Sequence, residues 1–191
     1  MEVHNVHETN WISLRRIVDI THPGEGYYYS HESRCNGHIV AVLPFGFAED
    51  LSIRYLLRYD ITPCWSDQPQ LCVLTGGMDT NDPVLDALRE LEEESGYVAT
   101  ADQLIDLGFC MGSKSSDSIY HIFAIDVTGM PKGEAKGDGS YCESHGRTVW
   151  VEDVSKGIDA QAAMAALRLE AWFRRQSGVS TPPEQTSQHV D

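Results

Sequence analysis

Three glutamates, Glu90, Glu93 and Glu94, stand close together in a stretch of helical character. On a helix of 3.6 residues per turn, Glu94 lies roughly 40° from Glu90, and Glu93 lies roughly 60° to its other side. Asp86 falls on the same arc, one turn earlier. Like charges at this spacing repel, and Mg²⁺ or Mn²⁺, which prefer oxygen ligands, would relieve the repulsion. The spacing alone leaves two interpretations open, a metal site and a solvated acidic face. On both interpretations, the substitution Glu94→Gln is expected to leave the helix unharmed.

Helix start and stop signals flank these glutamates. Asn81 or Asp82 is a suitable N-cap, Pro83 suits the first helical position, and Gly96 suits the exit. A short apolar strand, LCVLT, and a Gly-Gly pair precede the helix. The side chains that point away from the glutamates and are expected to face the core are Val84, Leu88 and Leu91.

The segment Arg89-Glu90-Leu91-x-Glu93-Glu94-x-Gly96-Tyr97 fills every specified position of the pattern R-E-U-x-E-E-x-G-U, in which U is apolar or aromatic. This is the core of the Nudix box, and the chain resembles the Nudix hydrolases. That family binds divalent cations on a loop-helix-loop and hydrolyses a phosphoanhydride in compounds of the form nucleoside diphosphate-X. The resemblance implies that Arg89 orients the glutamates by ion pairing and acts in catalysis together with Glu93. The metal ligands that it implies for Mg²⁺ or Mn²⁺ are Glu90, Glu93, Glu94 and Gly77.

The start of the box departs from the family pattern. That pattern has a Gly, five residues, a Glu and seven residues before the arginine, which would place the Glu at Asn81 and the Gly at Thr75. The observed Gly77 is two residues closer to Arg89, so the loop is shorter and its Glu is missing. The candidate replacements are Asp79, Asp82 and Asp86.

Apolar and β-branched runs predict the strands around this helix. The expected strands are WISLRRIVDI and YYYSHESR as a hairpin about the turn THPGEG, then HIVAVLPF, IRYLLRYDI, LCVLT, SIYHIFAIDVT and RTVWVE. DAQAAMAALRLEAWFRR is expected to be a closing amphipathic helix. The predicted fold class is α/β, an α+β sandwich with a Nudix-type mixed β-sheet flanked by helices. The expected divisions are N-terminal strands at 1–38, a hydrolase domain at 39–175 and a disordered tail at 176–191.

Outside the box the chain is similar to ADP-ribose and nucleotide-sugar pyrophosphatases. That similarity implies hydrolysis of ADP-ribose to AMP and ribose 5-phosphate. The alternatives are a nucleotide sugar such as UDP-glucose, a nucleoside triphosphate, or a non-catalytic sensor of ADP-ribose or a nucleotide. Glu143, on a long Gly-rich loop, is the first choice of general base, and Glu134 is the second. The predicted substrate-binding residues are Arg54, Arg58 and Lys114.

The amino-acid composition limits the classes of partner that the chain could bind. The chain has 191 residues and a formal net charge of −15, which argues against a nucleic-acid backbone or an anionic membrane as partner. A small phosphorylated substrate remains compatible, since cations recruited by carboxylates neutralise it locally. The five scattered cysteines predict free thiols in a reducing cytoplasm. Related pyrophosphatases are often dimers that share their N-terminal strands, so a homodimer is expected.

Overall fold

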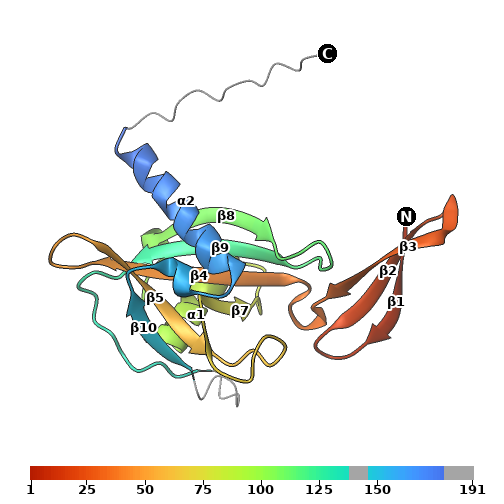
Figure 1. The fold of residues 1–191 in the computed structure, drawn as a ribbon, viewed down its shortest axis with the longest axis horizontal. Helices are drawn as coiled ribbons and strands as arrows, with labels where there is room; N and C mark the ends of the chain where they lie inside the picture. The colour runs from red at the N-terminus through yellow and green to blue at the C-terminus, as the bar shows by residue number, and fades with distance from the viewer. Residues whose placement is uncertain (138–145, 179–191) are drawn as a thin grey trace.

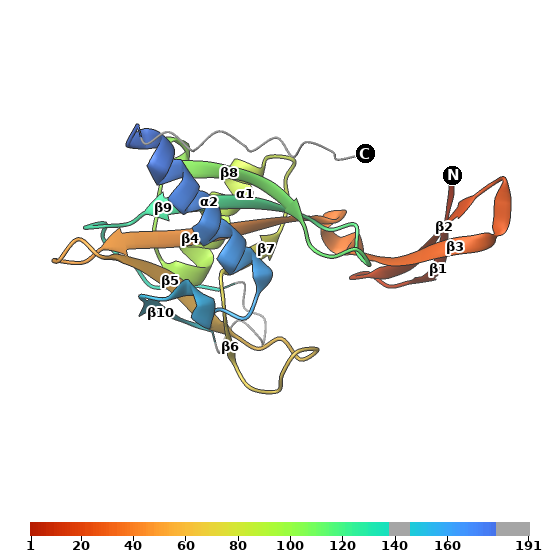
Figure 2. The same ribbon diagram turned by 45° about the horizontal axis from the view of Figure 1, so that its top comes forward.

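Two separate β-sheets, of three and seven strands, organise the chain (Figure 1). The computed structural model describes residues 1–137 and 146–178. Figures 1 and 2 show the smaller, N-terminal sheet projecting from one end of a body that contains the larger sheet and both α-helices. The two parts meet where β3 enters a short 3-10 helix, Ser33–Cys35, before the first strand of the body.

The N-terminal sheet is antiparallel throughout, in the order β1-β2-β3. Its strands are β1 Glu2–Glu8, β2 Ser13–Asp19 and β3 His22–His31. The predicted hairpin is β2–β3, although its turn is confined to Ile20 and Thr21 because β3 already begins at His22. The prediction contained no strand before it. β1 was missed because all seven of its residues are exposed, so it carries none of the apolar alternation that marks a half-buried strand.

The larger sheet is mixed, with the order β10-β5-β4-β9-β8, while β6 pairs with β5 and β7 with β4. Its central strands β4 and β9 are parallel, and the other pairs are antiparallel. The strands are β4 His38–Phe47, β5 Ile53–Asp60, β6 Gln70–Cys72, β7 Leu74–Gly77, β8 Leu104–Met111, β9 Ile119–Asp126 and β10 Arg147–Val151.

One helix covers each face of this sheet, α1 (Pro83–Ser95) on one side and α2 (Ala160–Gln176) on the other (Figure 2). Because side chains alternate along a strand, β4 supplies both cores. Val40 and Val42 belong to the core beneath α1, and Leu43 and Phe45 belong to the core beneath α2. The predicted sandwich of helices around a mixed sheet is therefore confirmed.

Helix α2 is held at its first turn by a buried carboxylate. Asp159 accepts a hydrogen bond from the Val73 N–H at 3.1 Å and caps the helix by accepting one from the Ala162 N–H at 3.1 Å. Burial raises the pKa of Asp159 despite these two hydrogen bonds. Asp159 thus ties the start of α2 to the link between β6 and β7, which leads into the box.

The C-terminal tail that the sequence predicted to be disordered lies mainly outside the described residues, which end at Gly178 just after α2. No helix among the described residues is both long enough and apolar enough to cross a lipid bilayer. Cys35, Cys64, Cys72 and Cys110 are free thiols, as predicted. Cys142 lies outside the described residues.

Candidate functional site

Helix α1 begins and ends where the sequence predicts. The Asp82 side chain caps it by accepting from the Val84 N–H at 2.9 Å, and Gly96 ends it in the left-handed region at φ 79°. Its core face differs in one residue from the prediction. Ala87 is fully buried, as is Leu91, whereas Leu88 is only half-buried and lines a surface hollow. The prediction for Leu88 was wrong because the core stripe follows the spacing 84, 87, 91.

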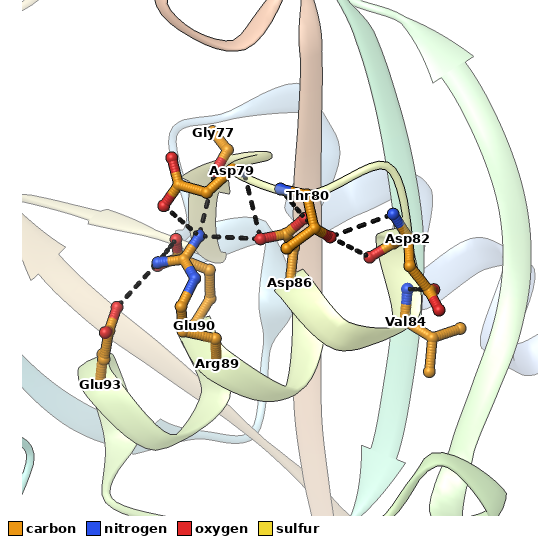
Figure 3. Close-up of polar contacts among 9 residues, drawn as sticks. All are labelled: Gly77, Asp79, Thr80, Asp82, Val84, Asp86, Arg89, Glu90 and Glu93. Atoms are coloured by element: carbon orange, nitrogen blue, oxygen red, sulfur yellow. Dashed lines mark hydrogen bonds and ion pairs between the residues drawn. The ribbon is translucent and has the colours of Figure 1, made fainter.

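The shortened turn before α1 is organised by the buried carboxylate of Asp86 (Figure 3). It accepts hydrogen bonds from the N–H of Asp79 at 3.2 Å and from the N–H and hydroxyl of Thr80 at 3.1 and 2.7 Å. Burial acts to raise the pKa of Asp86, but the hydrogen bonds from Thr80, Asp79 and Arg89 outweigh it, so the pKa lies below its usual value. Asp86 therefore closes the loop.

The guanidinium of Arg89 lies among four carboxylates (Figure 3). One of its nitrogens is 2.8 Å from Glu90 and 2.9 Å from Glu93. The other terminal nitrogen, Nη2, is 3.2 Å from Asp86, 3.4 Å from Asp79 and 3.1 Å from the carbonyl oxygen of Gly77. Burial acts to lower the pKa of Arg89, but these carboxylates raise it above its ordinary value. Arg89 thus holds Glu90 and Glu93 in place, as the resemblance implied.

Glu90 occupies a place that depends on the absence of a side chain at Gly76. A Cβ added to Gly76 would lie 1.8 Å from a carboxylate oxygen of Glu90, and such a contact cannot be accommodated without displacing the glutamate. Glu90 is buried, with 5% of the residue exposed. The Gly-Gly pair before the helix therefore provides the space in which the Glu90 carboxylate lies against β7.

Glu94 points into the protein, toward β5 and β7. One carboxylate oxygen pairs with Arg58, and the other accepts from the Thr75 N–H at 3.0 Å. Arg58 also pairs with Asp60 at 2.7 Å and is itself buried. The expectation of three glutamates on one open acidic face is therefore only partly met, because Arg58, on the face of β5 toward α1, draws Glu94 inward.

A cavity of about 390 Å³ opens at the turn between β7 and α1. It is lined by Arg34, Thr75, Gly76, Gly77, Asp79, Arg89, Glu90, Glu93 and Gly137. The structure thus brings together four residues of the predicted site, and Glu94 lies behind them. The sequence reasoning missed Arg34, which lies well before the box and belongs to no motif.

The donors at this cavity fit a divalent cation such as Mg²⁺. Glu90 and Glu93 offer carboxylate oxygens, and Gly77 offers a carbonyl oxygen. The space left by the missing side chain at Gly76 gives the Glu90 carboxylate a defined position. In the described part of the chain no three His, Cys, Asp or Glu side chains form a group that could hold a metal unaided. Mg²⁺ commonly takes one or two carboxylates and completes its shell with water and substrate phosphates, which suits this donor set.

The other predicted residues lie elsewhere. Arg54 pairs in register with Gly46 of β4, whereas Gly77 pairs with Ile39, seven residues away and so roughly 23 Å along the strand. Lys114 lies in the β8–β9 loop, where its carbonyl oxygen accepts a hydrogen bond from Tyr27 of the N-terminal sheet. Neither lines the cavity.

Both candidate bases lie between β9 and β10 in the sequence. Glu134 is exposed. Glu143 lies outside the described residues, so its assignment stays a prediction. The described start of this loop is attached to α1, since the Gly133 N–H donates to Gly96 O at 2.8 Å and the Gly137 N–H donates to Glu93 O at 2.9 Å.

Comparisons with known proteins show which solved structures have a similar fold. No protein-family model matches the sequence, and a search of curated proteins finds no match. Among solved structures, an ADP compounds hydrolase is similar with a TM-score of 0.65 and 18% sequence identity, over 94% of this chain and 95% of that chain. A MutT/Nudix family protein from Enterococcus faecalis has a TM-score of 0.48 and 14% identity, over 60% of this chain and 42% of that chain. The first likeness spans nearly the whole chain and shows that the chain shares the fold of that hydrolase.

Proposed function

We propose that the chain is a metal-dependent pyrophosphohydrolase of a nucleoside diphosphate linked to another group, with ADP-ribose as substrate and AMP and ribose 5-phosphate as products. One observation carries the proposal. Glu90 and Glu93, held by Arg89, line a cavity at the Gly76–Gly77 turn, in a chain that shares its fold with an ADP compounds hydrolase. A nucleotide sugar or a nucleoside triphosphate is the alternative substrate.

Each residue has a defined part in this reaction. Glu90, Glu93 and the Gly77 carbonyl would hold Mg²⁺ or Mn²⁺, which supplies charge neutralisation on the diphosphate and acidifies a water. Arg89 fixes the orientation of both carboxylates, and Arg58 fixes Glu94, so we propose that Arg58 positions Glu94 and does not contact substrate. We assign no substrate contact to Arg54 or Lys114, which do not line the cavity.

Hydrolysis needs a base for the attacking water. The water oxygen forms a new bond to phosphorus while the bridging P–O bond of the anhydride breaks. The proton goes to a carboxylate, and we keep Glu143 as the proposed acceptor. Glu143→Gln should lower kcat by about 100-fold or more, as expected for loss of a general base, whereas Glu134→Gln should change it little. Equal rates for both variants and wild type would exclude this loop as the source of the base.

The direct test is turnover of ADP-ribose, UDP-glucose and nucleoside triphosphates with Mg²⁺ or Mn²⁺, with products identified by mass. Activity should disappear in excess chelator and return with added metal. Glu93→Gln should reduce kcat strongly, and its matched control is Glu92→Gln, the same change on the preceding residue, which does not line the cavity. Full turnover in chelator, or equal loss in the two variants, would contradict the metal mechanism.

A second candidate function is a sensor that binds ADP-ribose or a nucleotide without cleaving it. The observation that favours it is the inward position of Glu94, which is engaged by Arg58 and Thr75. Binding of ADP-ribose with no products after prolonged incubation with Mg²⁺ would establish the sensor. Appearance of AMP would exclude it.

We also propose a homodimer formed through the N-terminal sheet. This sheet stands away from the body (Figure 1), and several of its apolar and aromatic side chains are exposed, namely Val3, Val6, Leu14, Tyr27 and Tyr28. Light scattering should give twice the chain mass for the protein and the single-chain mass after deletion of residues 1–31. The free thiols suit a reducing compartment, and we propose the cytoplasm.

A further inference from the structure

The carboxylate cavity adjoins a second hollow of about 340 Å³ on the side toward the start of β4. Arg34 and Asp79 line both. The residues that give the second hollow its polar character are Asn36, His38, Asn81 and His121. A ligand that extends from the glutamates past Arg34 therefore enters a separate, polar compartment.

Arg34 differs from the other arginines near this site. Arg89 and Arg58 are both ion-paired with carboxylates. Arg34 has neither an ion pair nor a hydrogen bond among residues 1–137 and 146–178, and its guanidinium carbon lies 5.3 Å from the centre of the Trp11 ring. Its donors are available to a ligand.

Its position is set by a close approach to the turn. A Cβ added to Gly77 would lie 2.9 Å from a guanidinium nitrogen of Arg34, so a side chain at that position would crowd it. The guanidinium thus lies against the same turn whose Gly77 carbonyl faces Arg89. Its planar set of donors matches the oxygens of a phosphate, and here it lies between the two hollows.

The second hollow has the chemistry to recognise a heterocyclic base. The rings of His38 and His121 are stacked, with centroids 5.4 Å apart and the Nδ1 of His38 3.1 Å from the Nε2 of His121. Burial and the neighbouring His38 lower the pKa of His121, so its ring is neutral near pH 7. Because its Nε2 is engaged by His38, its Nδ1 is the nitrogen that a ligand can use as a donor or an acceptor. Two asparagine amides, Asn36 and Asn81, add further donors and acceptors.

We propose that Arg34 binds the phosphate attached to the nucleoside and that the His38–His121 hollow holds the base, so that the other group lies beyond the glutamates. This inference rests on the proposed function for the identity of the ligand. It assigns specificity for the nucleotide half of the substrate to residues outside the box.

The test is calorimetric titration with AMP and with ribose 5-phosphate, which are products and undergo no turnover. Arg34→Gln should weaken AMP binding by about tenfold or more, the loss expected for a charge-assisted contact to phosphate, and Arg34→Lys should recover part of it. The matched control is Arg54→Gln, the same charge change at an exposed arginine on the far end of the sheet. Since Arg34 is exposed, folding should be unchanged, and the melting temperature verifies this.

The role of the His38–His121 hollow is tested by comparing a ligand that carries a heterocyclic base with one that does not. His121→Ala should weaken AMP binding and leave ribose 5-phosphate binding unchanged, because the latter carries no base. The inference is overturned if wild type binds no AMP, if Arg34→Gln and Arg54→Gln lose equal affinity, or if His121→Ala weakens both ligands alike. Failure of the proposed function is separate, because a protein that binds AMP through Arg34 but never cleaves ADP-ribose would disprove hydrolysis and keep this site.

Discussion

Arg58 and Glu94 form an ion pair that is almost completely shielded from solvent, with 4% and 3% of their side chains exposed. The pair joins the central part of the sheet to the last turn of α1, since Arg58 lies on β5 and Glu94 on the helix. Asp60 and the Thr75 N–H also belong to this network. One of the three box glutamates therefore holds the helix in place.

Glu94→Gln should destabilise the fold. The spacing of like charges predicted that this change would leave the helix unharmed, but the structure indicates the opposite, because the buried Arg58 would lose one of its charged carboxylate partners. Breaking a buried pair costs about 3 kcal/mol or more. Urea unfolding measures the loss, and Glu92→Gln should stay within about 0.5 kcal/mol of wild type, because Glu92 is half-exposed and its partner Lys136 is exposed. Equal stability of both variants would show that the Arg58 pair contributes nothing net.

Arg89→Gln should make stability depend on divalent cations. The change leaves Asp79, Asp86, Glu90 and Glu93 without their shared counter-charge, so the unfolding free energy should fall by about 2 kcal/mol at low ionic strength. Millimolar Mg²⁺ should restore part of this loss by occupying the same region. The melting temperature with and without Mg²⁺ measures the effect, and Arg54→Gln is the control. A loss that Mg²⁺ does not reduce would argue against a cation site at this cavity.

Asp159→Asn should flatten the dependence of stability on pH. Burial raises the folded-state pKa of Asp159 above the ordinary value of an aspartate. Between these two pKa values the folded state binds more protons than the unfolded state, so this group lowers stability as pH rises through that window. The asparagine variant lacks that slope, although it also loses one of the two backbone contacts. Urea midpoints from about pH 3.5 to 7 give the comparison, and parallel curves would contradict it.

The cysteines should differ in reactivity by their burial. Burial raises the pKa of Cys72 to about 12, with nearby carboxylates adding to the effect, so almost no reactive thiolate forms at pH 8. Cys64 is exposed. Peptide mapping after brief alkylation of the native protein should find Cys64 modified and Cys72 intact, and both modified in denaturant. Early labelling of Cys72 would show that the link between β6 and β7 opens in the native state.

The local features of the box were predictable because they depend on neighbours in sequence. The Asp82 cap, the Gly96 exit and the Arg89 pairs with Glu90 and Glu93 all follow from residues within one or two helical turns. The apolar strands β4 and β9 were also predictable, because both faces of each are buried and the runs are continuous.

What the sequence did not reveal depends on contacts between distant residues. Arg54 and Arg58 occupy the same face of β5, yet one ends exposed and the other buried, because only Arg58 lies opposite Glu94 on α1. Helical periodicity places Glu94 on the acidic arc and carries no information about what the sheet presents to it. Arg34 is far from the box in sequence, and only the pairing of β4 with β7 brings its neighbourhood to the Gly77 turn.

The turn held by Asp86 has a thermodynamic consequence for any ligand of this site. Three donors from Asp79 and Thr80 already fix the backbone of the turn in the free protein. A ligand that binds there does not need to order a flexible loop, so little conformational entropy is lost on association. The shape of this turn is therefore set before anything binds.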